Sequence, residues 1–485
     1  MHGSDAGPPL PDQFIGTDRC GRSGSGKAMG AIAQRLNGRR ILIWGYGREG
    51  KSTERYIREH CAPASVDVFE GKKDGFDEEN YDVIIKSPGI VMPEDDPKVT
   101  SQTELFLSEF RDQVVGITGT KGKSTTSAML YEVLRACGRD ALLVGNIGQP
   151  CLDDADIVTP DTVVVYEMSC HQLEHCHVSP AVGVFLNLFE EHLDHYGTLE
   201  AYFQAKSHVA SFMRSGDIFY RGCNVPEIST RANVLRVHED SSITAERVER
   251  ELSCCDADLG ALSASLAFGD APARHFRLSI AGLHNQYNAA IVYDIAVRVF
   301  ACDPERAEQA IEAFRGLPHR LSLVKTDDAG RRWYDDSIST IPEAAIGAAD
   351  SIAGKKTMLL GGMDRGIDYG SLEAYIREHP EIRFLFAYAS GCRMMRELAG
   401  HGRPGAAPAF DAQQANSDEA PTAEELRAVP DHCRWAGDLA GQTALARELT
   451  PAGGAVILSP ASPSYGYFKN FEDRGEQFKA IISRG

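Results

Sequence analysis

Short apolar runs alternate with amphipathic segments along most of the chain from Arg39 onward. Runs such as RILIW, which ends at Trp44, and the segments 141–146, 161–169 and 181–188 have the length and residue types of buried strands. Gly-rich or polar turns follow several of these runs, and segments of helical periodicity come next. Strands that alternate with helices in this way are typical of α/β proteins built on mostly parallel sheets.

The C-terminal third repeats this alternation after an interruption at 316–321, GLPHRL, where we expect a hinge. The segment 322–337 predicts a β-hairpin, and a helix capped by Asp303 is predicted over 303–316. Further apolar runs predict strands at 356–362, 384–390 and 455–461. The pattern as a whole therefore predicts three α/β units.

Three stretches lack this periodicity. Residues 1–35 are rich in Gly, Ser, Pro and Asp and are predicted to form a disordered extension. Residues 401–425 are predicted to be a low-complexity surface insertion. The stretch from about 223 to 280 is polar and weakly patterned, and it predicts no elements.

Composition narrows the function classes. The chain has 485 residues, which suits about three domains, and a formal charge of −19 that argues against broad nucleic-acid binding. Its 12 cysteines are scattered without a C-x-x-C pair, as expected of reduced thiols in the cytosol. No apolar run approaches the roughly 18 residues of a membrane helix, and the N-terminus lacks the pattern of a signal peptide. We therefore expect a cytoplasmic protein without membrane or nucleic-acid partners.

The sequence TGTKGKSTT, Thr118 to Thr126, carries the clearest chemical signal. It lies between a predicted strand and a predicted helix, where two glycines allow backbone N–H groups to surround a triphosphate. Lys123 would neutralise the β- and γ-phosphates, and the Ser124 hydroxyl would ligate Mg²⁺. Ile117 replaces the first glycine of the usual phosphate loop, so this is a variant form. The alternative is a structural Gly-rich turn, which the strand before it and the helix after it disfavour.

A second Gly-rich turn, GYGREG at 45–50, also follows a strand and opens a helix. The pattern G-x-G-x-x-G suits the diphosphate of a nucleotide-linked substrate. It also fits a dinucleotide, for which Glu70 would be the acidic residue about 20 positions later. A tight strand–helix turn without a ligand is the third interpretation, and the pattern alone does not separate them.

Two polar motifs, EMSCHQLE and FEEHLDHYGT, follow consecutive predicted strands. Glu167 offers a hard oxygen ligand for Mg²⁺, and His192 and Asp194 suit a metal or a phosphate. A single carboxylate or histidine in such a position is normally a solvated loop residue. Two such motifs beside a phosphate loop favour a metal or phosphate site. Lys206 lies in a predicted helix, and periodicity alone indicates a surface lysine.

Two pairs of polar residues are further candidates. Asn285 and Asn288 lie one helical turn apart in HNQYN, which suits contacts to adenine or phosphate, with helix capping as the alternative. Arg320 in LPHR and Asp336 in YDDSIST are candidate nucleotide contacts from the following domain, with a surface ion pair as the alternative.

Taken in order, these segments resemble the Mur ligase family, the ATP-dependent amide-forming enzymes of peptidoglycan synthesis. The resemblance runs from about residue 39 to the C-terminus and rests on the motifs T-G-T-x-G-K-S-T, E-x-S-x-x-Q-L-E, E-H-L-D, H-N-x-x-N and L-P-H-R. KSPGI, GNIG, DDSIST and the ending LSPASPSYGYFKNFEDRG make it most similar to the glutamate-adding MurD branch. It implies a Rossmann-like N-terminal domain that binds the UDP-linked substrate, a central P-loop ATPase domain with a mostly parallel sheet, and a Rossmann-like glutamate-binding domain, over 36–112, 113–316 and 317–485.

The resemblance also implies roles for individual residues. The residues that it assigns to ATP are Thr120, Lys121, Gly122, Lys123, Ser124, Thr125, Thr126, Asn285, Asn288, Arg320 and Asp336. Those assigned to Mg²⁺ are Ser124, Glu167, His192 and Lys206, the last through a carbamate on its amine. The UDP-linked substrate is assigned Arg48, Glu49, Ser87 and Asn146, and glutamate is assigned Thr340, Arg365, Ser464 and Phe471. The expected catalytic residues are Lys123, Glu167, His192 and Lys206.

Four positions near the expected glutamate site depart from common MurD sequences, namely Ile338, Ile341, Arg365 and Gly466. The D-S-I-S-T and G-G-x-D-R-G motifs are shared with a subgroup that includes ligases adding L-glutamate. The resemblance thus implies a monomeric enzyme that adds D-glutamate to UDP-N-acetylmuramoyl-L-alanine through an acyl phosphate, with L-glutamate as the alternative amino acid.

Three other functions fit parts of the sequence. A folylpolyglutamate synthase-like amide ligase shares the central motifs but lacks a comparable N-terminal domain. A nucleotide-binding regulator without catalysis would bind ATP without substrate-stimulated hydrolysis, and it would not need the expected catalytic residues. An NAD-dependent oxidoreductase rests on GYGREG alone.

Overall fold

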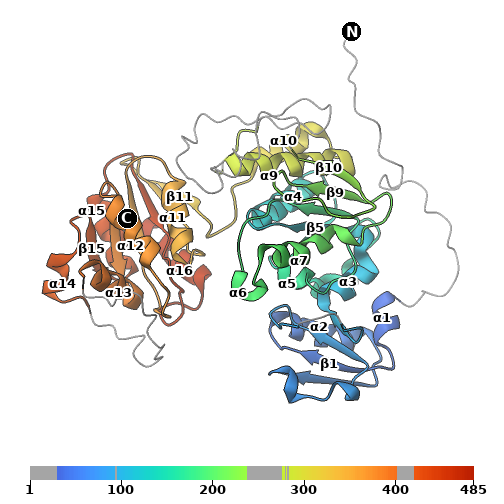
Figure 1. Cartoon of the computed structure of the whole chain (residues 1–485). Coiled ribbons are helices and arrows are strands. Elements are labelled where there is room, and N and C mark those ends of the chain that lie inside the picture. Colours follow the sequence, from blue (N-terminus) through green and yellow to red (C-terminus); the bar gives the residue numbers. More distant parts are fainter. Residues whose placement is uncertain are drawn as a thin grey trace, which may run out of the picture. The chain divides into compact units, whose positions relative to one another are not determined.

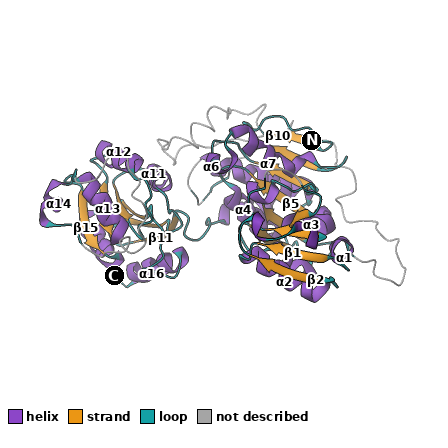
Figure 2. Ribbon diagram, turned by 60° about the horizontal axis from the view of Figure 1, so that its bottom comes forward, coloured by secondary structure: helices purple, strands orange, loops and turns teal. Residues whose placement is uncertain are grey.

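The computed structural model describes residues 30–92, 96–237, 276–278, 280, 283–400 and 420–484. Near Phe314 the chain divides into two compact units (Figure 1). Two sheets belong to the first unit and a third sheet to the second. In each unit the strands form the inner layer and helices cover them (Figure 2).

The first sheet has the strand order β2-β1-β3-β4, and its neighbouring strands are all parallel. Its strands are β1 (Arg40–Trp44), β2 (Ser65–Phe69), β3 (Val83–Lys86) and β4 (Val99–Ser101). The helices are α1 (Ala31–Leu36), α2 (Arg48–His60) and α3 (Gln102–Phe110), with the short 3₁₀ turns η1 (Lys73–Gly75), η2 (Glu78–Asn80) and η3 (Arg111–Gln113). The central strands β1 and β3 are buried almost throughout, as their continuous Ile and Leu runs require of a parallel sheet.

The second sheet has the order β10-β9-β8-β5-β7-β6 and is parallel throughout. Its strands are β5 (Val114–Thr118), β6 (Ala141–Gly145), β7 (Val163–Glu167), β8 (Val182–Phe185), β9 (Ile218–Arg221) and β10 (Asn233–Arg236). The helices are α4 (Lys123–Ala136), η4 (Cys151–Ile157), α5 (Cys170–Leu173), α6 (Leu193–Tyr196), α7 (Leu199–Ser211), α9 (Leu283–Asp294) with its π-helical end η5 (Ile295–Val299), and α10 (Pro304–Ala313). Strand β5 is central, so the loop that follows it lies at the middle of the sheet's carboxyl edge.

The first two sheets share one hydrophobic core. Ile43 of β1 and Ile85 of β3 belong to the same continuous cluster of buried side chains as Val144, Tyr166 and Phe185 of the second sheet. The helices α2 and α3 pack against η4, which follows β6. This continuity keeps the Gly-rich turn after β1 and the loop after β5 within one folded unit.

The third sheet has the order β11-β12-β16-β13-β14-β15. Its strands are β11 (Ser322–Thr326), β12 (Arg332–Asp335), β13 (Lys356–Leu360), β14 (Arg383–Ala387), β15 (Cys433–Gly437) and β16 (Ala455–Leu458). Only β11 runs antiparallel to its neighbour; the other pairs are parallel. The helices are α11 (Pro342–Asp350), α12 (Gly370–Glu378), α13 (Tyr388–Leu398), α14 (Ala423–Ala428), α15 (Leu439–Leu449) and α16 (Phe471–Ser483). Separate apolar clusters lie on its two faces, so helices bury both sides of this sheet.

The predicted α/β fold with mostly parallel sheets is confirmed. The predicted hairpin is the pair β11 and β12, and Asp303 caps α10 by accepting a hydrogen bond from the backbone N–H of Arg306 at 2.9 Å. The predicted domain ranges stay predictions, because the two sheets of the first unit share a core. Among the helices that the structure describes, none combines the length and the apolar character needed to cross a bilayer.

Two predictions of irregular structure are wrong in part. The extension predicted over 1–35 ends in α1, whose Ile32 and Leu36 are fully buried; residues 1–29 lie outside the described part of the chain. The insertion predicted over 401–425 ends in α14, which Thr422 caps by accepting a hydrogen bond from the N–H of Glu425; residues 401–419 lie outside the described part. Both helices are only six residues long, so they present too little periodicity to be seen in the sequence.

Four strands were not predicted, and one of them, β9, is a mostly buried run of only four residues. Strand β10 lies in the weakly patterned stretch 223–280, much of which lies outside the described residues. Strand β10 is a largely exposed edge strand, β15 is a partly exposed edge strand, and β4 has only three residues. Edge and very short strands carry little apolar signal, because at most one face is buried.

We expect Leu36→Ala to lower the free energy of unfolding of the first unit by about 2–4 kcal/mol, because it leaves a cavity under α1. The exposed Gln34 of the same helix provides the control, and Gln34→Ala should change that free energy by less than about 0.5 kcal/mol. Denaturant unfolding followed by tryptophan fluorescence measures both. Equal stability of the two variants would mean that α1 contributes nothing to the core.

Candidate active site

Two glycines shape the loop between β5 and α4. Gly119 has φ +152°, and a Cβ there would lie 3.0 Å from the Cβ of Leu186. Gly122 has φ +84°, and a Cβ there would lie 3.1 Å from Oδ1 of Asn288. An L side chain is strained in both conformations, so glycine is needed at each for the chain to turn from strand to helix. The loop thus presents backbone at the N-terminus of a 14-residue helix, which suits an anion.

Residues after β8 fix the other side of this loop. The amide side chain of Asn187 accepts a hydrogen bond from the N–H of Lys121 at 2.8 Å and donates to its carbonyl at 3.0 Å. The hydroxyl of Thr120 accepts from the N–H of Phe189 at 2.9 Å. Lys121 also pairs with the Glu191 carboxylate at 2.8 Å. These contacts define the conformation of the loop, and Asn187 was not among the predicted site residues.

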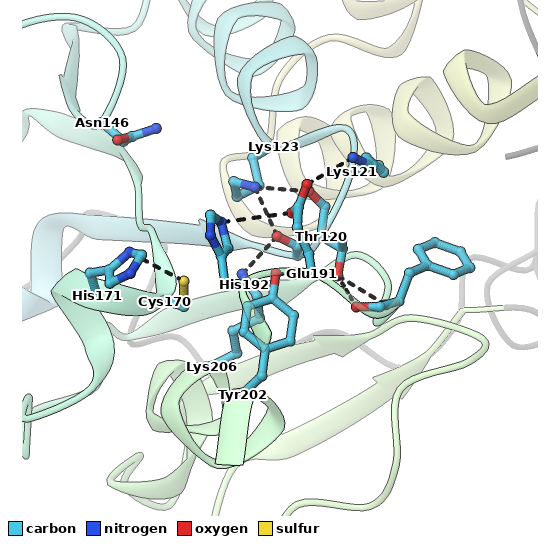
Figure 3. A network of polar contacts seen from close by, with 12 residues as sticks. Thr120, Lys121, Lys123, Asn146, Cys170, His171, Glu191, His192, Tyr202 and Lys206 are labelled. Atoms are coloured by element: carbon cyan, nitrogen blue, oxygen red, sulfur yellow. Dashed lines mark hydrogen bonds and ion pairs between the residues drawn. The ribbon is translucent and has the colours of Figure 1, made fainter. Parts of the chain in front are cut away.

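Two lysine ammonium groups converge on this loop (Figure 3). Lys123 donates to the carbonyls of Gly119 and Thr120, at 2.9 Å each. Lys206 donates to the same Gly119 carbonyl at 2.8 Å. Burial lowers the pKa of Lys123, while the carboxylates of Glu167 and Glu191 favour its charged form.

The burial of Lys206 corrects the surface position that periodicity alone indicated. Lys206 is 1% exposed and lies on the buried face of α7. Its ammonium lies 4.7 Å from the ring centre of Tyr202, which is one helical turn earlier. Burial, together with the nearby charge of Lys123, lowers the pKa of Lys206 to about 7. An appreciable share of this amine is therefore neutral near neutral pH.

Glu167 ends β7, and its carboxylate is fully buried. The side-chain amide of Asn146 donates to Oε1 at 2.9 Å, whereas Oε2 is buried and accepts no hydrogen bond. A buried carboxylate oxygen without a partner is costly unless a cation or a donor meets it. Together with the Ser124 hydroxyl on the first turn of α4, this oxygen fits Mg²⁺, which prefers carboxylate and hydroxyl ligands.

His192 lies in the loop after β8 and has φ +56°, an unusual value for a non-glycine residue. Burial lowers the pKa of His192, the Glu191 carboxylate opposes this shift, and the charges of Lys206 and Lys123 add to it. The imidazole is therefore neutral at neutral pH, with a lone pair for a metal or a proton. The side chain of Asp194, the other candidate in this motif, lies outside what the structure describes.

Some of these groups line one cavity of about 310 Å³ in the first unit, whereas Ser124 and Glu167 are not part of its lining. It brings together four of the predicted site residues, Lys123, Asn146, His192 and Lys206. Its wall also contains six residues that were not predicted as site residues, namely Pro88, Gly89, Ser169, Cys170, His171 and Tyr202. Most of these residues lie in the motifs KSPGI and EMSCHQLE. The two motifs therefore indicated the region of the site, although they did not identify these individual residues. Tyr202 had a signal as well, since it lies four residues before Lys206.

The turn after β1 carries the residues expected at the UDP-linked substrate. Gly45 has φ +92°, and its carbonyl accepts a hydrogen bond from the Ser87 hydroxyl at 2.9 Å. Arg48 donates to the carbonyl of Gly148 at 3.0 Å, and Glu49 accepts from the side-chain amide of Gln172 at 2.7 Å. Burial raises the pKa of Glu49, and Gln172, Arg48 and Lys86 oppose that shift. Both contacts join the first sheet to the second.

Asn285 and Asn288 lie on α9 and are both buried. The side-chain amide of Asn288 donates to Oδ1 of Asn285 at 3.3 Å. Because a Cβ on Gly122 would meet Asn288, this helix face packs against the loop after β5. The spacing in HNQYN therefore places the pair beside the phosphate loop.

In the second unit, Asp336 is buried, and this excludes the surface ion pair considered for it. Its carboxylate accepts hydrogen bonds from the Leu321 N–H at 3.0 Å and the Ser459 hydroxyl at 2.8 Å. Burial raises the pKa of Asp336 to about 6, although these bonds and the charge of Arg320 oppose the shift. Arg320 itself is exposed.

Three of the four residues expected to hold glutamate belong to loops of one sheet edge, and the fourth, Phe471, begins α16. Thr340 follows β12, Arg365 follows β13 and Ser464 follows β16, and these three parallel strands are neighbours in the order β12-β16-β13. The carboxyl ends of neighbouring parallel strands lie at the same edge, where open α/β sheets bind ligands. Ser464 is buried, Thr340 is half-buried and Arg365 is exposed.

A buried arginine holds these loops together. Arg474 of α16 donates to the Ser337 carbonyl at 2.7 Å, the Ser337 hydroxyl at 2.9 Å and the Ser462 carbonyl at 3.0 Å. The Ser337 hydroxyl in turn donates to the carbonyl of Phe471 at 2.8 Å. Burial lowers the pKa of Arg474 to about 10. The motif NFEDRG contained this residue, but nothing local indicated that its guanidinium would be buried.

Comparison with known proteins gives a consistent result. The family described as Mur ligase middle domain matches residues 117–296. A UDP-N-acetylmuramoylalanine--D-glutamate ligase of Aquifex aeolicus is 28% identical, with 91% of this chain and 98% of the relative covered. Among solved structures, MurF from Acinetobacter baumannii has the same fold, with a TM-score of 0.52, 16% identity and coverage of 85% of this chain and 90% of that one. MurC from Thermotoga maritima also shares it, with a TM-score of 0.51, 15% identity and coverage of 92% and 99%.

Two relatives named as L-glutamate ligases reach 30% identity or more. A UDP-N-acetylmuramoyl-L-alanine--L-glutamate ligase of Salinispora tropica is 30% identical, with 92% of this chain and 98% of the relative covered. A ligase of the same name from a Micromonospora species is 31% identical, with 92% of this chain and 97% of the relative covered. At this identity over nearly the whole length of both proteins, the chain belongs to the Mur ligase family, the ATP-dependent amide ligases of peptidoglycan synthesis.

Proposed function

We propose that this ligase joins glutamate to UDP-N-acetylmuramoyl-L-alanine. The observation that carries the proposal is the cavity, in which Lys123 of the phosphate loop, Lys206 and His192 share a wall with Pro88 and Gly89 of the first sheet. A nucleotide on the loop and a substrate on the first sheet could therefore meet at one place. The glutamate-adding relatives support the choice of amino acid.

The chemistry begins with an activation step, because a carboxylate is a poor electrophile. A carboxylate oxygen of the alanine attacks the γ-phosphorus of ATP, the bond to the β-phosphate oxygen breaks, and ADP leaves. Lys123 is placed to stabilise the negative charge that moves onto the β- and γ-phosphates. The glutamate amine, once it has lost a proton, then attacks the acyl carbon and phosphate leaves, which completes the amide.

The metal sites follow from the donor set. Ser124 and Glu167 would hold one Mg²⁺, and His192 and Lys206 would lie at a second. When bound, Mg²⁺ supplies positive charge that offsets the charge of the phosphates. Lys206 has no oxygen ligand of its own, but its neutral amine can add CO₂ to give a carbamate, and the lowered pKa of Lys206 favours this form.

Two candidate functions differ in the enantiomer of glutamate that the enzyme adds. L-glutamate is favoured by the D-S-I-S-T and G-G-x-D-R-G motifs and by the names of the Salinispora and Micromonospora relatives. The apolar Ile338 and Ile341 lie in the loop after β12, and Ile341 is 43% exposed at a position where common MurD sequences carry a polar residue. D-glutamate, the first expectation from the sequence, is supported by the names of the Aquifex relative and of further relatives that are 27–30% identical. The cytoplasmic location and the monomeric state stay predictions.

Phosphate release with ATP, Mg²⁺ and UDP-N-acetylmuramoyl-L-alanine tests the proposal when D-glutamate and L-glutamate are compared. We expect turnover with L-glutamate, exceeding turnover with D-glutamate by at least about tenfold, since a tenfold ratio corresponds to about 1.4 kcal/mol of differential transition-state binding. Turnover with D-glutamate alone would establish the second candidate. No turnover with either would contradict the glutamate assignment of the second unit.

Lys123→Ala should reduce glutamate-dependent ADP release by about 100- to 1000-fold, because a charge that stabilises the transition state is lost. Arg135→Ala, at the other end of α4 where the side chain is 55% exposed, should leave ADP release unchanged. The thermal unfolding midpoint of each variant shows that the fold persists. Undiminished ADP release in Lys123→Ala would exclude the loop as the ATP site.

Lys206 should make stability depend on pH. Its folded pKa of about 7 lies below the ordinary value of 10.5, so the unfolded state binds more protons between these values. In CO₂-free buffer the free energy of unfolding should therefore gain a few kcal/mol from this group as the pH rises from 7 towards 10.5. Lys206→Met should remove this gain, whereas Lys51→Met, at an exposed position, should retain it. Parallel pH profiles for all three proteins in denaturant unfolding would refute the assignment.

A further inference from the structure

The short helix α5 forms one wall of the cavity. Ser169, Cys170 and His171, at its N-terminal end, all line it. Four residues are too few to hold a helix by themselves, so its geometry depends on side chains. The Ser169 hydroxyl accepts a hydrogen bond from the Gln172 N–H at 3.2 Å, and the Gln172 side-chain oxygen accepts from the Ser169 N–H at 2.9 Å.

Gln172 also reaches the first sheet with its other polar atom. Its Nε2 donates to Oε1 of Glu49 at 2.7 Å, and Gln172 is only 3% exposed. Glu49 is the second residue of α2 and lies in the Gly-rich turn after β1. One side chain thus connects that turn to Ser169 at the cavity wall.

The C-terminal end of α5 makes a second contact with the first sheet. Oε2 of Glu174 lies 3.9 Å from Nζ of Lys86, and Lys86 is 3% exposed. Lys86 ends β3 and donates to the carbonyl of Ile90 at 2.9 Å. The residues between them include Pro88 and Gly89, which also line the cavity. Side chains from the first sheet therefore hold α5 at both ends.

One oxygen of the Glu49 carboxylate is satisfied and the other is not. Oε2 is buried and accepts no hydrogen bond, although Arg48 and Lys86 supply positive charge nearby. A carboxylate oxygen with no donor inside a ligand-binding turn will respond to a hydrogen-bond donor that a ligand brings there. Because Oε1 holds Gln172, a change in the Glu49 carboxylate reaches Ser169 through one side chain.

We propose that Gln172, held by Glu49, is a positioning residue that couples the Gly-rich turn to the nucleotide side of the cavity. The inference rests on the proposed function, in which the UDP-linked substrate binds at that turn. Substrate binding fixes the Glu49 carboxylate, Gln172 follows, and Ser169 is placed for the arriving nucleotide and its metal. Linkage requires the effect to be reciprocal, so that each ligand tightens the binding of the other by the same factor.

The experiment measures the dissociation constant of a non-hydrolysable ATP analogue with Mg²⁺, by calorimetry, with and without saturating UDP-N-acetylmuramoyl-L-alanine. In the wild type we expect the UDP-linked substrate to tighten analogue binding at least about fivefold, the lower end of typical coupling. In Glu49→Ala and Gln172→Ala the factor should fall below about twofold, and the double variant should lose no more than either single one. Glu49→Gln keeps an oxygen that accepts from Gln172, so it should restore the factor.

Glu59→Ala is the matched control. Glu59 lies on the same helix, α2, with its side chain 60% exposed, so this variant removes the same charge without touching α5. It should keep the wild-type factor. If Gln172→Ala does not fold, Gln172→Asn serves instead, because its shorter side chain cannot reach both Ser169 and Glu49.

Each outcome decides between the two proposals. Wild-type coupling that persists in Glu49→Ala and in Gln172→Ala overturns the positioning role, as does a wild type that binds both ligands without coupling. A loss that Glu49→Gln fails to restore also overturns it, because the hydrogen bond would then not be the cause. A wild type that binds the ATP analogue but not the UDP-linked substrate overturns the proposed function instead, and this inference with it.

Discussion

The carbonyl oxygen of Gly119 accepts hydrogen bonds from two lysines, Lys123 at 2.9 Å and Lys206 at 2.8 Å. Burial lowers the pKa of both lysines, and the nearby charge of Lys123 adds to the shift of Lys206. The arrangement is tolerable only because the carboxylates of Glu167 and Glu191 lie near enough to offset part of the charge. The negative charge of a polyanion offsets the positive charge that remains. The affinity of the site for phosphates therefore follows from the closeness of the two lysines.

The sequence was sufficient to predict the features that depend on residues close together in the chain. The phosphate loop needs only a strand, two glycines, a lysine and a helix in succession, and each leaves a local signal around Gly119 to Lys123. The spacing of Asn285 and Asn288 likewise fixed one helix face without any knowledge of the fold. Strands β5, β7 and β16 were visible because they are buried on both sides and read as continuous apolar runs.

The burial of two charged side chains depends on contacts with residues far away in the sequence, and it could not be predicted from the sequence. Lys206 is polar, so the pattern of α7 indicated a surface position, although seven residues of that helix are buried. Its burial is set by Gly119 and Tyr202, and the first of these is 87 residues away along the chain. Arg474 was missed for the same reason, since its partners Ser337 and Ser462 come from other loops. Buried charged residues of this kind are satisfied by tertiary contacts, and no local pattern encodes those.

The hydrophobic core that the first two sheets share has a consequence for dynamics. Residues of one continuous core tend to open and close together, so the turn after β1 and the loop after β5 draw on a common opening free energy. Neither ligand-binding element can gain flexibility by loosening its own sheet alone. Adaptation to different ligands in this unit is then confined to side chains and short connecting segments, while the two backbones respond as a single elastic body.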